Sequence, residues 1–411
     1  MILWLAGALA MYMAWAIGAN DVANAMGTSV GSGALTIRRA VIVAAVLEFS
    51  GALFVGGHVT DTVRKGMLDM QLVQADPQLL LYGMLGALAA AATLLAVATA
   101  YGLPVSTTHS IVGAIVGFGS VALGVDAVNW GKVAQIVASW VTSPLIGGVL
   151  AFLIFNLVRY LILDRDDPFA SARRTGPFFF FFVTFVIALV TLFKGLKNLK
   201  LNFDLPEALA LSFGVGVVGA LLGWWVIHRV KRASSANTEK RFGGVERIFV
   251  VLQIMTACAV AFAHGSNDVA NSIGPLAAVA AVVRDSDLSQ KAPVEVWMLM
   301  IGGIGIVFGL ATWGYRVMET VGRKITELTP SRGFSAELAA ALTIVLASRL
   351  GIPVSTTHIL VGSVLGVGLA RGIGALDLRV VGRIVVSWVA TLPIAALLSI
   401  FFFYFFKGLL S

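Results

Sequence analysis

A long internal duplication constrains this chain more than any other feature of its sequence. Residues 18–24 (GANDVAN) return as residues 265–271 (GSNDVAN), and residues 102–109 (GLPVSTTH) return as residues 351–358 (GIPVSTTH). The first pair of motifs is 247 residues apart and the second pair 249, so one long unit is repeated almost in register. Polar groups inside apolar sequence are costly to bury without partners or a ligand. Paired, interrupted apolar segments of this kind predict the binding site of a secondary transporter.

The composition agrees with a chain that lies in a bilayer. Of the 411 residues, 58% are hydrophobic and 12% are charged, whereas soluble chains carry about 25% charge. The formal charge of +8 comes from basic residues in short loops, a pattern typical of membrane topology, so we do not expect nucleic-acid binding. The first apolar run begins at Ile2 without a basic region before it, which favours a retained membrane segment over a signal peptide. The lone Cys258 excludes an intrachain disulfide.

We predict an all-α integral membrane protein with about twelve transmembrane segments, arranged as two inverted-topology repeats with broken or re-entrant helices. Residues 1–163 form repeat 1 and residues 248–411 form repeat 2, each with five apolar segments. Residues 164–228 are linking transmembrane segments, and residues 229–247 are a basic loop. The predicted segments are 2–18, 38–59, 79–100, 104–121, 130–163, 177–194, 206–228, 248–264, 294–315, 335–349, 355–370 and 379–406. Seven segments before repeat 2 would make that repeat enter from the opposite face.

Charge predicts the orientation. We predict that the protein lies in the cell (plasma or inner) membrane with both termini on the outer side. In this orientation most Lys and Arg residues fall on the cytoplasmic side, including those of the 229–247 loop. Lys194, Lys197 and Lys200 oppose this scheme. A plain topological loop is favoured for 229–247 over a regulatory or lipid-binding element.

The PVSTTH motif predicts an anion site at a helix start. Pro is tolerated there, Ser and Thr cap helices well, and the free amides with the helix dipole favour an anion. Inverted symmetry can bring two such helix ends together near the midplane. The alternative is that the hydroxyls merely cap buried helices. The candidate anion-binding hydroxyls are Ser106, Thr107, Thr108, Ser355, Thr356 and Thr357.

The NDVAN motif predicts a cation site. Its two Asn residues lie at i and i+4 and therefore on the same helix face. Carboxylate and amide oxygens are hard ligands suited to Na⁺. Gly18 and Gly265 could let the helix break and free carbonyls as further ligands. The alternative is that the two Asp residues are neutral packing groups. The candidate Na⁺ ligands are Asn20, Asp21, Asn24, Asn267, Asp268, Asn271 and Glu48, with Glu48 in either a cation or a helix-contact role.

Neither motif contains Lys or Arg, the usual counter-charges for an anion. Two aspartates would repel a bare anion unless a bound Na⁺ or a proton neutralises them, so anion and cation would bind together. Asp21 or Asp268 could also accept a hydrogen bond from the proton that phosphate carries near neutral pH. Sulfate carries no such proton. No cofactor is expected beyond the co-transported ion.

Three further polar residues carry weaker signals. His109 and His358 follow the motif serines by one helical turn, and a hydrogen bond that fixes the loop is favoured over a proton relay. Glu337 is predicted to be a first-turn acid at the start of its helix.

At these residues the chain resembles the inorganic phosphate transporter (PiT) family of Na⁺- or proton-coupled phosphate symporters. The resemblance covers almost the whole chain, including residues 27–33 (GTSVGSG) and 333–338 (GFSAEL). It implies phosphate symport, twelve membrane segments with outward termini, and a homodimer. It also implies phosphate and cation contacts at Asp21, Asn24, Ser106, Thr107 and Thr108 and at their partners Asp268, Asn271, Ser355, Thr356 and Thr357. Ser266 departs from the family pattern by a small substitution.

The leading prediction is a Na⁺-coupled symporter of inorganic phosphate that works by alternating access. The alternatives are a proton-coupled phosphate, metal-phosphate or sulfate permease and a passive channel. An intramembrane enzyme acting on phosphorylated lipid is disfavoured, because the sequence shows no Arg or Lys clamp for a phosphoryl group.

Overall fold

The computed structural model is built from helices. It describes residues 1–56, 67–68, 76–192, 204–230, 242–284, 294–349 and 354–411. Within these ranges the β-structure is limited to an isolated bridge between Leu68 and Val128. The first half contains α1 (Ile2–Gly31), α2 (Ile37–Val55), α5 (Pro77–Ala100), α6 (Thr107–Ala122), η2 (Val125–Ala127), α7 (Trp130–Val158) and η3 (Arg159–Leu163).

Two helices link the halves, and the second half follows. The linking helices are α8 (Pro168–Val190) and α9 (Leu205–Arg229), which pack on each other. The second half contains α11 (Gly243–Asp268), α12 (Ala270–Val283), α13 (Val296–Thr312), α14 (Gly314–Glu319), η6 (Thr320–Lys324), α15 (Pro330–Arg349), α16 (Thr356–Ala370), η7 (Ile373–Ala375) and α17 (Leu378–Leu410).

Each of the twelve predicted apolar segments coincides with a helix or a consecutive helix pair. Seven helical stretches of the described chain are long and apolar enough to cross a membrane. The helix α13 and the following residues Gly314–Lys324 are bent by 59° relative to each other, and the number of candidate crossings rises to eight if they are counted as one. The helices α6 and α16 are shorter, in agreement with the short segments predicted there. Helix α2 is not among the seven stretches, and it carries three charged residues. The chain is therefore a multi-pass helical membrane protein, and the count of twelve crossings stays a prediction.

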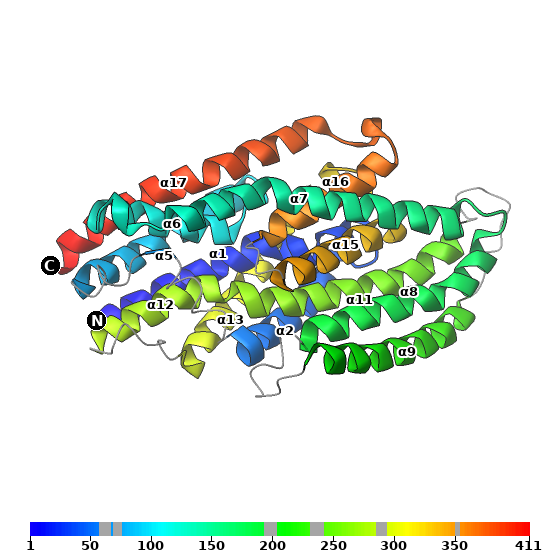
Figure 1. Ribbon diagram of the computed structural model, residues 1–411. Helices are drawn as coiled ribbons and strands as arrows, with labels where there is room; N and C mark the ends of the chain where they lie inside the picture. Colours follow the sequence, from blue (N-terminus) through cyan, green and yellow to red (C-terminus); the bar gives the residue numbers. More distant parts are fainter. Residues whose placement is uncertain (57–66, 69–75, 193–203, 231–241, 285–293, 350–353) are drawn as a thin grey trace.

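The two halves pack with an approximate two-fold exchange of partners. Helix α1 packs on α13, and its counterpart α11 packs on α2. In the same way α7 packs on α16 and α15, whereas α17 packs on α6 and α5. In Figure 1 the chain runs away from the N-terminus along α1, but α11 and α12 return toward it, and α7 and α17 also run in opposite directions. Each half therefore buries its helices mainly against the other half.

Glycines allow the closest of these crossings. A Cβ atom added at Gly18 would lie 2.0 Å from the carbonyl oxygen of Ile306, and one at Gly265 would lie 2.1 Å from that of Glu48. The predicted helix break is wrong for Gly18, whereas in the second copy the helix is interrupted at Val269, four residues after Gly265. Helix α1 is continuous through Gly18, and the chain passes from α11 to α12 at Val269 with helical dihedral angles. The missing side chain serves close approach of two backbones rather than a break.

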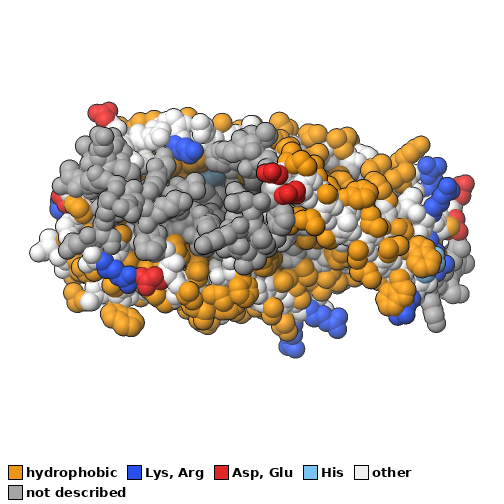
Figure 2. Space-filling view, turned by 60° about the horizontal axis from the view of Figure 1, so that its bottom comes forward, with side chains coloured by type: hydrophobic (Ala, Val, Ile, Leu, Met, Phe, Trp, Pro, Cys, Tyr) orange, Lys and Arg blue, Asp and Glu red, His pale blue; other side chains and the backbone are white. Residues whose placement is uncertain are grey.

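The surface agrees with a membrane environment. Figure 2 shows hydrophobic side chains over much of the described part of one face, with a group of Lys and Arg side chains at one end of the molecule. Helix α9 contributes many exposed apolar side chains, among them Leu221 and Trp224. Part of the predicted basic loop, residues 231–241, lies outside the described residues, as do Lys194, Lys197 and Lys200.

Candidate functional site

Asp21 of α1 lies where the starts of two helices from different halves meet. The hydroxyl of Thr107, in the first turn of α6, donates a hydrogen bond to Oδ2 of Asp21. The hydroxyl of Thr357, in the first turn of α16, lies 3.4 Å from Oδ1 of the same carboxylate. Nδ2 of Asn24 donates to the Thr357 hydroxyl over 2.9 Å. All four side chains are buried, so the structure brings these predicted site residues together inside the protein.

Ser106 and Ser355 hold the two helix starts in place. The Ser106 hydroxyl accepts a hydrogen bond from the backbone N–H of His109, and the Ser355 hydroxyl accepts one from the N–H of His358, both at 3.3 Å. Each serine is therefore an N-cap, which satisfies a backbone donor that the helix leaves unpaired. Thr108 and Thr356 lie next to the caps and are half-buried. Direct contacts of these four residues with an anion stay predictions.

Asn20 braces the loop that leads into α6. Its Nδ2 donates to Oγ1 of Thr99 at 2.9 Å and to the carbonyl oxygen of Leu103 at 3.0 Å. Its Oδ1 accepts from the N–H of Val105 at 3.1 Å. The amide thus ties α1 to the loop before the Ser106 cap, and a role for Asn20 as a cation ligand stays a prediction.

The second NDVAN copy lies at the junction of α11 and α12. Asp268 accepts a hydrogen bond from Nδ2 of Asn267 at 2.8 Å through Oδ1. Its Oδ2 lies 2.8 Å from Nε2 of His264. Asn271 is buried in the first turn of α12. Asp268 and Asp21 therefore approach each other through the imidazole that lies between them.

His264 is the central residue that sequence reasoning missed. Its Nε2 lies 2.8 Å from Asp268 and 3.9 Å from Asp21, and its Nδ1 lies 3.2 Å from Oε2 of Glu48. The expectation that the aspartates lack a cationic partner is corrected by this contact, because an imidazole can carry a positive charge. The only signal in the sequence was its position one helical turn before Asp268, at i and i+4.

The same cluster has the dimensions of a cation site. The ligand atoms of Asp21, His264 and Asp268 lie within 4.8 Å of one another, and all three residues are buried. Glu48, which the sequence singled out, is fully buried on α2 and faces the other nitrogen of the imidazole. A carboxylate behind a histidine is the usual arrangement that fixes the orientation of the ring. Whether Glu48 itself binds a cation stays a prediction.

Glu337 belongs to a second buried polar cluster. Its Oε1 accepts hydrogen bonds from the hydroxyls of Thr28 and of Ser29, the latter at 2.9 Å, and its Oε2 accepts one from Thr256 at 2.5 Å. The prediction of a first-turn acid is wrong, because α15 begins at Pro330 and Glu337 lies in its interior. This cluster joins the 27–33 and 333–338 motifs, which the sequence identified without showing that they meet.

His109 and His358 form an aromatic contact between the halves. Their ring centroids are 4.9 Å apart, and the ring of His358 stacks on Trp388 at 3.7 Å. Within the described loop before α6 the His109 imidazole makes no hydrogen bond, so the loop-fixing prediction is wrong for His109; the loop before α16 includes residues 350–353, which lie outside the described residues, and the prediction for His358 stays untested. The loop before α6 is instead held by Nε1 of Trp388, which donates to the carbonyl of Pro104 at 3.0 Å.

Comparison with known proteins identifies the family of the chain and supports its fold. Residues 17–399 match the sequence profile of the phosphate transporter family (PHO4). A protein of Haemophilus influenzae is 44% identical over 411 residues, covering 100% of this chain and 98% of its own. The inorganic phosphate transporter 2-1, chloroplastic, of Arabidopsis thaliana is 45% identical over 430 residues, covering 97% of this chain and 71% of its own. A solved structure described as the sodium-dependent phosphate transporter superposes with a TM-score of 0.89 at 41% identity and covers 100% of both chains.

Proposed function

Because this chain belongs to the phosphate transporter family, a family of carriers rather than enzymes, we propose that it is a Na⁺-coupled symporter of inorganic phosphate. In this proposal, phosphate binds between the first turns of α6 and α16, next to Asp21 and Asp268. The similar solved structure is that of a sodium-dependent phosphate transporter, which supports the choice of coupling ion.

The observation that carries the proposal is the convergence of two helix starts on one carboxylate. Thr107 from α6 and Thr357 from α16 both reach Asp21, although the two helices lie in different halves of the chain. Helix N-termini present free amides and the positive end of the dipole, and together they suit an anion with several acceptor oxygens. The threonine hydroxyls that now contact Asp21 would turn to phosphate oxygens when the anion binds.

The charge of the cluster supports coupling to a cation. Three carboxylates surround one imidazole, so even a protonated His264 cannot balance them when all three are ionised. An anion placed beside this cluster is repelled unless cations bind with it. The dependence is mutual, since bound phosphate also favours the cation, and this reciprocity is the coupling free energy of symport.

The acceptor oxygens of Asp21 and Asp268 also favour a protonated oxyanion. Phosphate near neutral pH carries a proton that it can donate to a carboxylate, whereas sulfate has none. If sulfate bound, a buried carboxylate oxygen would face a sulfate oxygen with no proton between them, and such an unpaired contact disfavours the wrong ligand strongly. We therefore infer selectivity for phosphate over sulfate.

The transport cycle that fits this site is alternating access. The opposite run of corresponding helices fits an inverted repeat, in which one half rocks against the other around a central site (Figure 1). We also propose a homodimer in the cell or inner membrane, with both termini outside and the 229–247 loop in the cytoplasm.

Uptake of labelled phosphate into proteoliposomes tests the proposal. A Na⁺ gradient should drive accumulation, a proton gradient alone should not, and excess sulfate should compete poorly. Uptake that neither gradient accelerates would refute symport.

One observation favours a second candidate, a proton-coupled phosphate permease. His264 lies between the two aspartates and could hold a coupling proton where the first candidate places Na⁺. Accumulation driven by a proton gradient in Na⁺-free buffer would select this alternative.

A further inference from the structure

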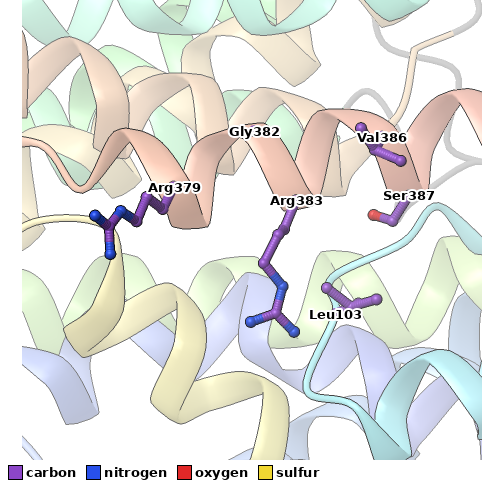
Figure 3. A pocket seen from close by; sticks show the side chains of 6 residues that line it. All are labelled: Leu103, Arg379, Gly382, Arg383, Val386 and Ser387. Atoms are coloured by element: carbon purple, nitrogen blue, oxygen red, sulfur yellow. The ribbon is translucent and has the colours of Figure 1, made fainter.

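A cavity of about 520 Å³ opens beside the loop that leads into α6. Its lining residues are Leu103, Arg379, Gly382, Arg383, Val386 and Ser387. Figure 3 shows both arginine side chains leaving α17 on the side where Leu103 lies. The two arginines are four residues apart, so they share one face of the helix.

Both guanidinium groups are without a partner in the described part of the chain, and both residues are exposed. Several other arginines of the protein form ion pairs. Arg371 lies 3.3 Å from Glu327, and Arg159 lies 3.4 Å from Asp164. Two free guanidiniums that face one cavity form an electropositive surface suited to an oxyanion.

The cavity adjoins the candidate phosphate site through the loop before α6. The carbonyl of Leu103 accepts a hydrogen bond from Asn20, the neighbour of Asp21. On the other wall, Ser387 precedes Trp388, which holds the carbonyl of Pro104. The lining of the cavity is therefore continuous with the backbone that leads to the Ser106 cap and Thr107.

Only one half of the chain provides this basic lining. Trp140 of α7 corresponds to Trp388 of α17, and the same offset places Gly131 at the position of Arg379 and Gln135 at that of Arg383. Arginines placed only to set membrane topology would not need to face a cavity. The pair of arginines is therefore a feature of α17 alone, although Lys132 lies next to the counterpart of Arg379 in α7.

We propose that Arg379 and Arg383 form a vestibule that collects a phosphate-type oxyanion at one mouth of the path, before or after it occupies the central site. This inference rests on the proposed phosphate transport and adds a second, weaker site to it. Two guanidiniums raise the local concentration of the anion and speed its capture. The cytoplasmic orientation predicted for the start of α17 places the vestibule on the inner side.

Side-specific kinetics test the vestibule. Phosphate transport is measured in right-side-out and inside-out membrane vesicles for the wild type and for the double variant Arg379→Gln, Arg383→Gln. We expect the KM for phosphate to rise about threefold to tenfold from the side of α17's first turn, with an unchanged maximal rate and an unchanged KM from the other side. The ionic-strength dependence of transport from the affected side should weaken as well.

The matched control is Arg174→Gln, which removes an exposed charge from the same predicted side on α8, a helix that packs on α9 and α11, and should leave both KM values unchanged. Arg383→Lys keeps the charge and should give an intermediate KM, which preserves the test if the double variant folds poorly. A KM that is unchanged from both sides, or raised equally from both, overturns the vestibule. A wild type that does not transport phosphate would instead refute the proposed function.

A lipid headgroup offers the same phosphate chemistry as the free ion. The measurement is therefore repeated in vesicles of phosphatidylcholine alone and of phosphatidylcholine with phosphatidylglycerol. The rise in KM should appear in both membranes. If it appears only with the anionic lipid, the cavity binds a headgroup and the proposal of a vestibule for free phosphate fails.

Discussion

The closest inter-half crossings predict that one added methyl group will disturb both stability and coupling. In Gly265→Ala the new Cβ would lie 2.1 Å from the carbonyl oxygen of Glu48, whereas ordinary contacts begin near 3.4 Å. Helices α2 and α11 must therefore separate by roughly 1 Å at this point. Overpacking of this kind costs about 1–3 kcal/mol, which exceeds the ~1 kcal/mol that alanine gains over glycine in a helix.

The same displacement acts on the site. His264 precedes Gly265, and its Nδ1 lies 3.2 Å from Oε2 of Glu48. Moving α2 outward by about 1 Å lengthens this contact and weakens the attraction between Glu48 and the imidazole, which then contacts Asp268 alone at short range. We expect a Tm lower by a few degrees and weaker Na⁺ dependence of phosphate uptake.

Gly7→Ala is the matched control. It lies in α1, and its Cβ would meet only the end of the Ile301 side chain at 3.7 Å. This variant should match or exceed the wild-type Tm, because it gains helix propensity without a clash. The assays are thermal unfolding in detergent followed by tryptophan fluorescence, and Na⁺ titration of phosphate uptake. A Gly265→Ala protein as stable and as tightly coupled as Gly7→Ala would refute the tight crossing.

Three further substitutions follow from the site. Asp21→Asn should weaken Na⁺-dependent phosphate binding at least tenfold with a small change in Tm, and calorimetric titration that showed unchanged affinity would remove Asp21 from the site. Thr107→Val should lower phosphate affinity about tenfold without altering the oligomeric state seen by size-exclusion chromatography, and intact affinity would leave the hydroxyl a structural role. Trp388→Phe removes the donor to the carbonyl of Pro104 and should lower stability by about 1 kcal/mol, which a melting experiment would contradict if Tm did not fall.

Local chemistry was enough to predict most of the helices and the two serine caps. Each predicted apolar segment coincides with a helix, because the length of an apolar run decides whether it can cross a bilayer, but α12 (Ala270–Val283) lies between two predicted segments and was missed. Ser106 and Ser355 cap their helices as predicted, because an N-cap bond joins residues only three positions apart. The duplication indicated which polar residues correspond in sequence but not what each contacts, since Asn20 bonds the loop before α6 whereas its counterpart Asn267 bonds Asp268.

Only the tertiary structure decided how the distant polar residues meet. His264 stands outside both repeated motifs, and its importance comes from Glu48 and Asp21, which lie on other helices. Glu337 was predicted at a helix start because the sequence does not show which hydroxyl groups contact it. In the structure, hydroxyls on α1 and α11 donate hydrogen bonds to its carboxylate. A glycine can allow either a helix break or a close crossing of two helices. At Gly18 and Gly265 only the position of the neighbouring backbone shows that the glycine allows a close crossing. The physical reason is that capping and hydrophobic length act within a few residues, whereas these contacts depend on how helices from opposite halves of the chain pack.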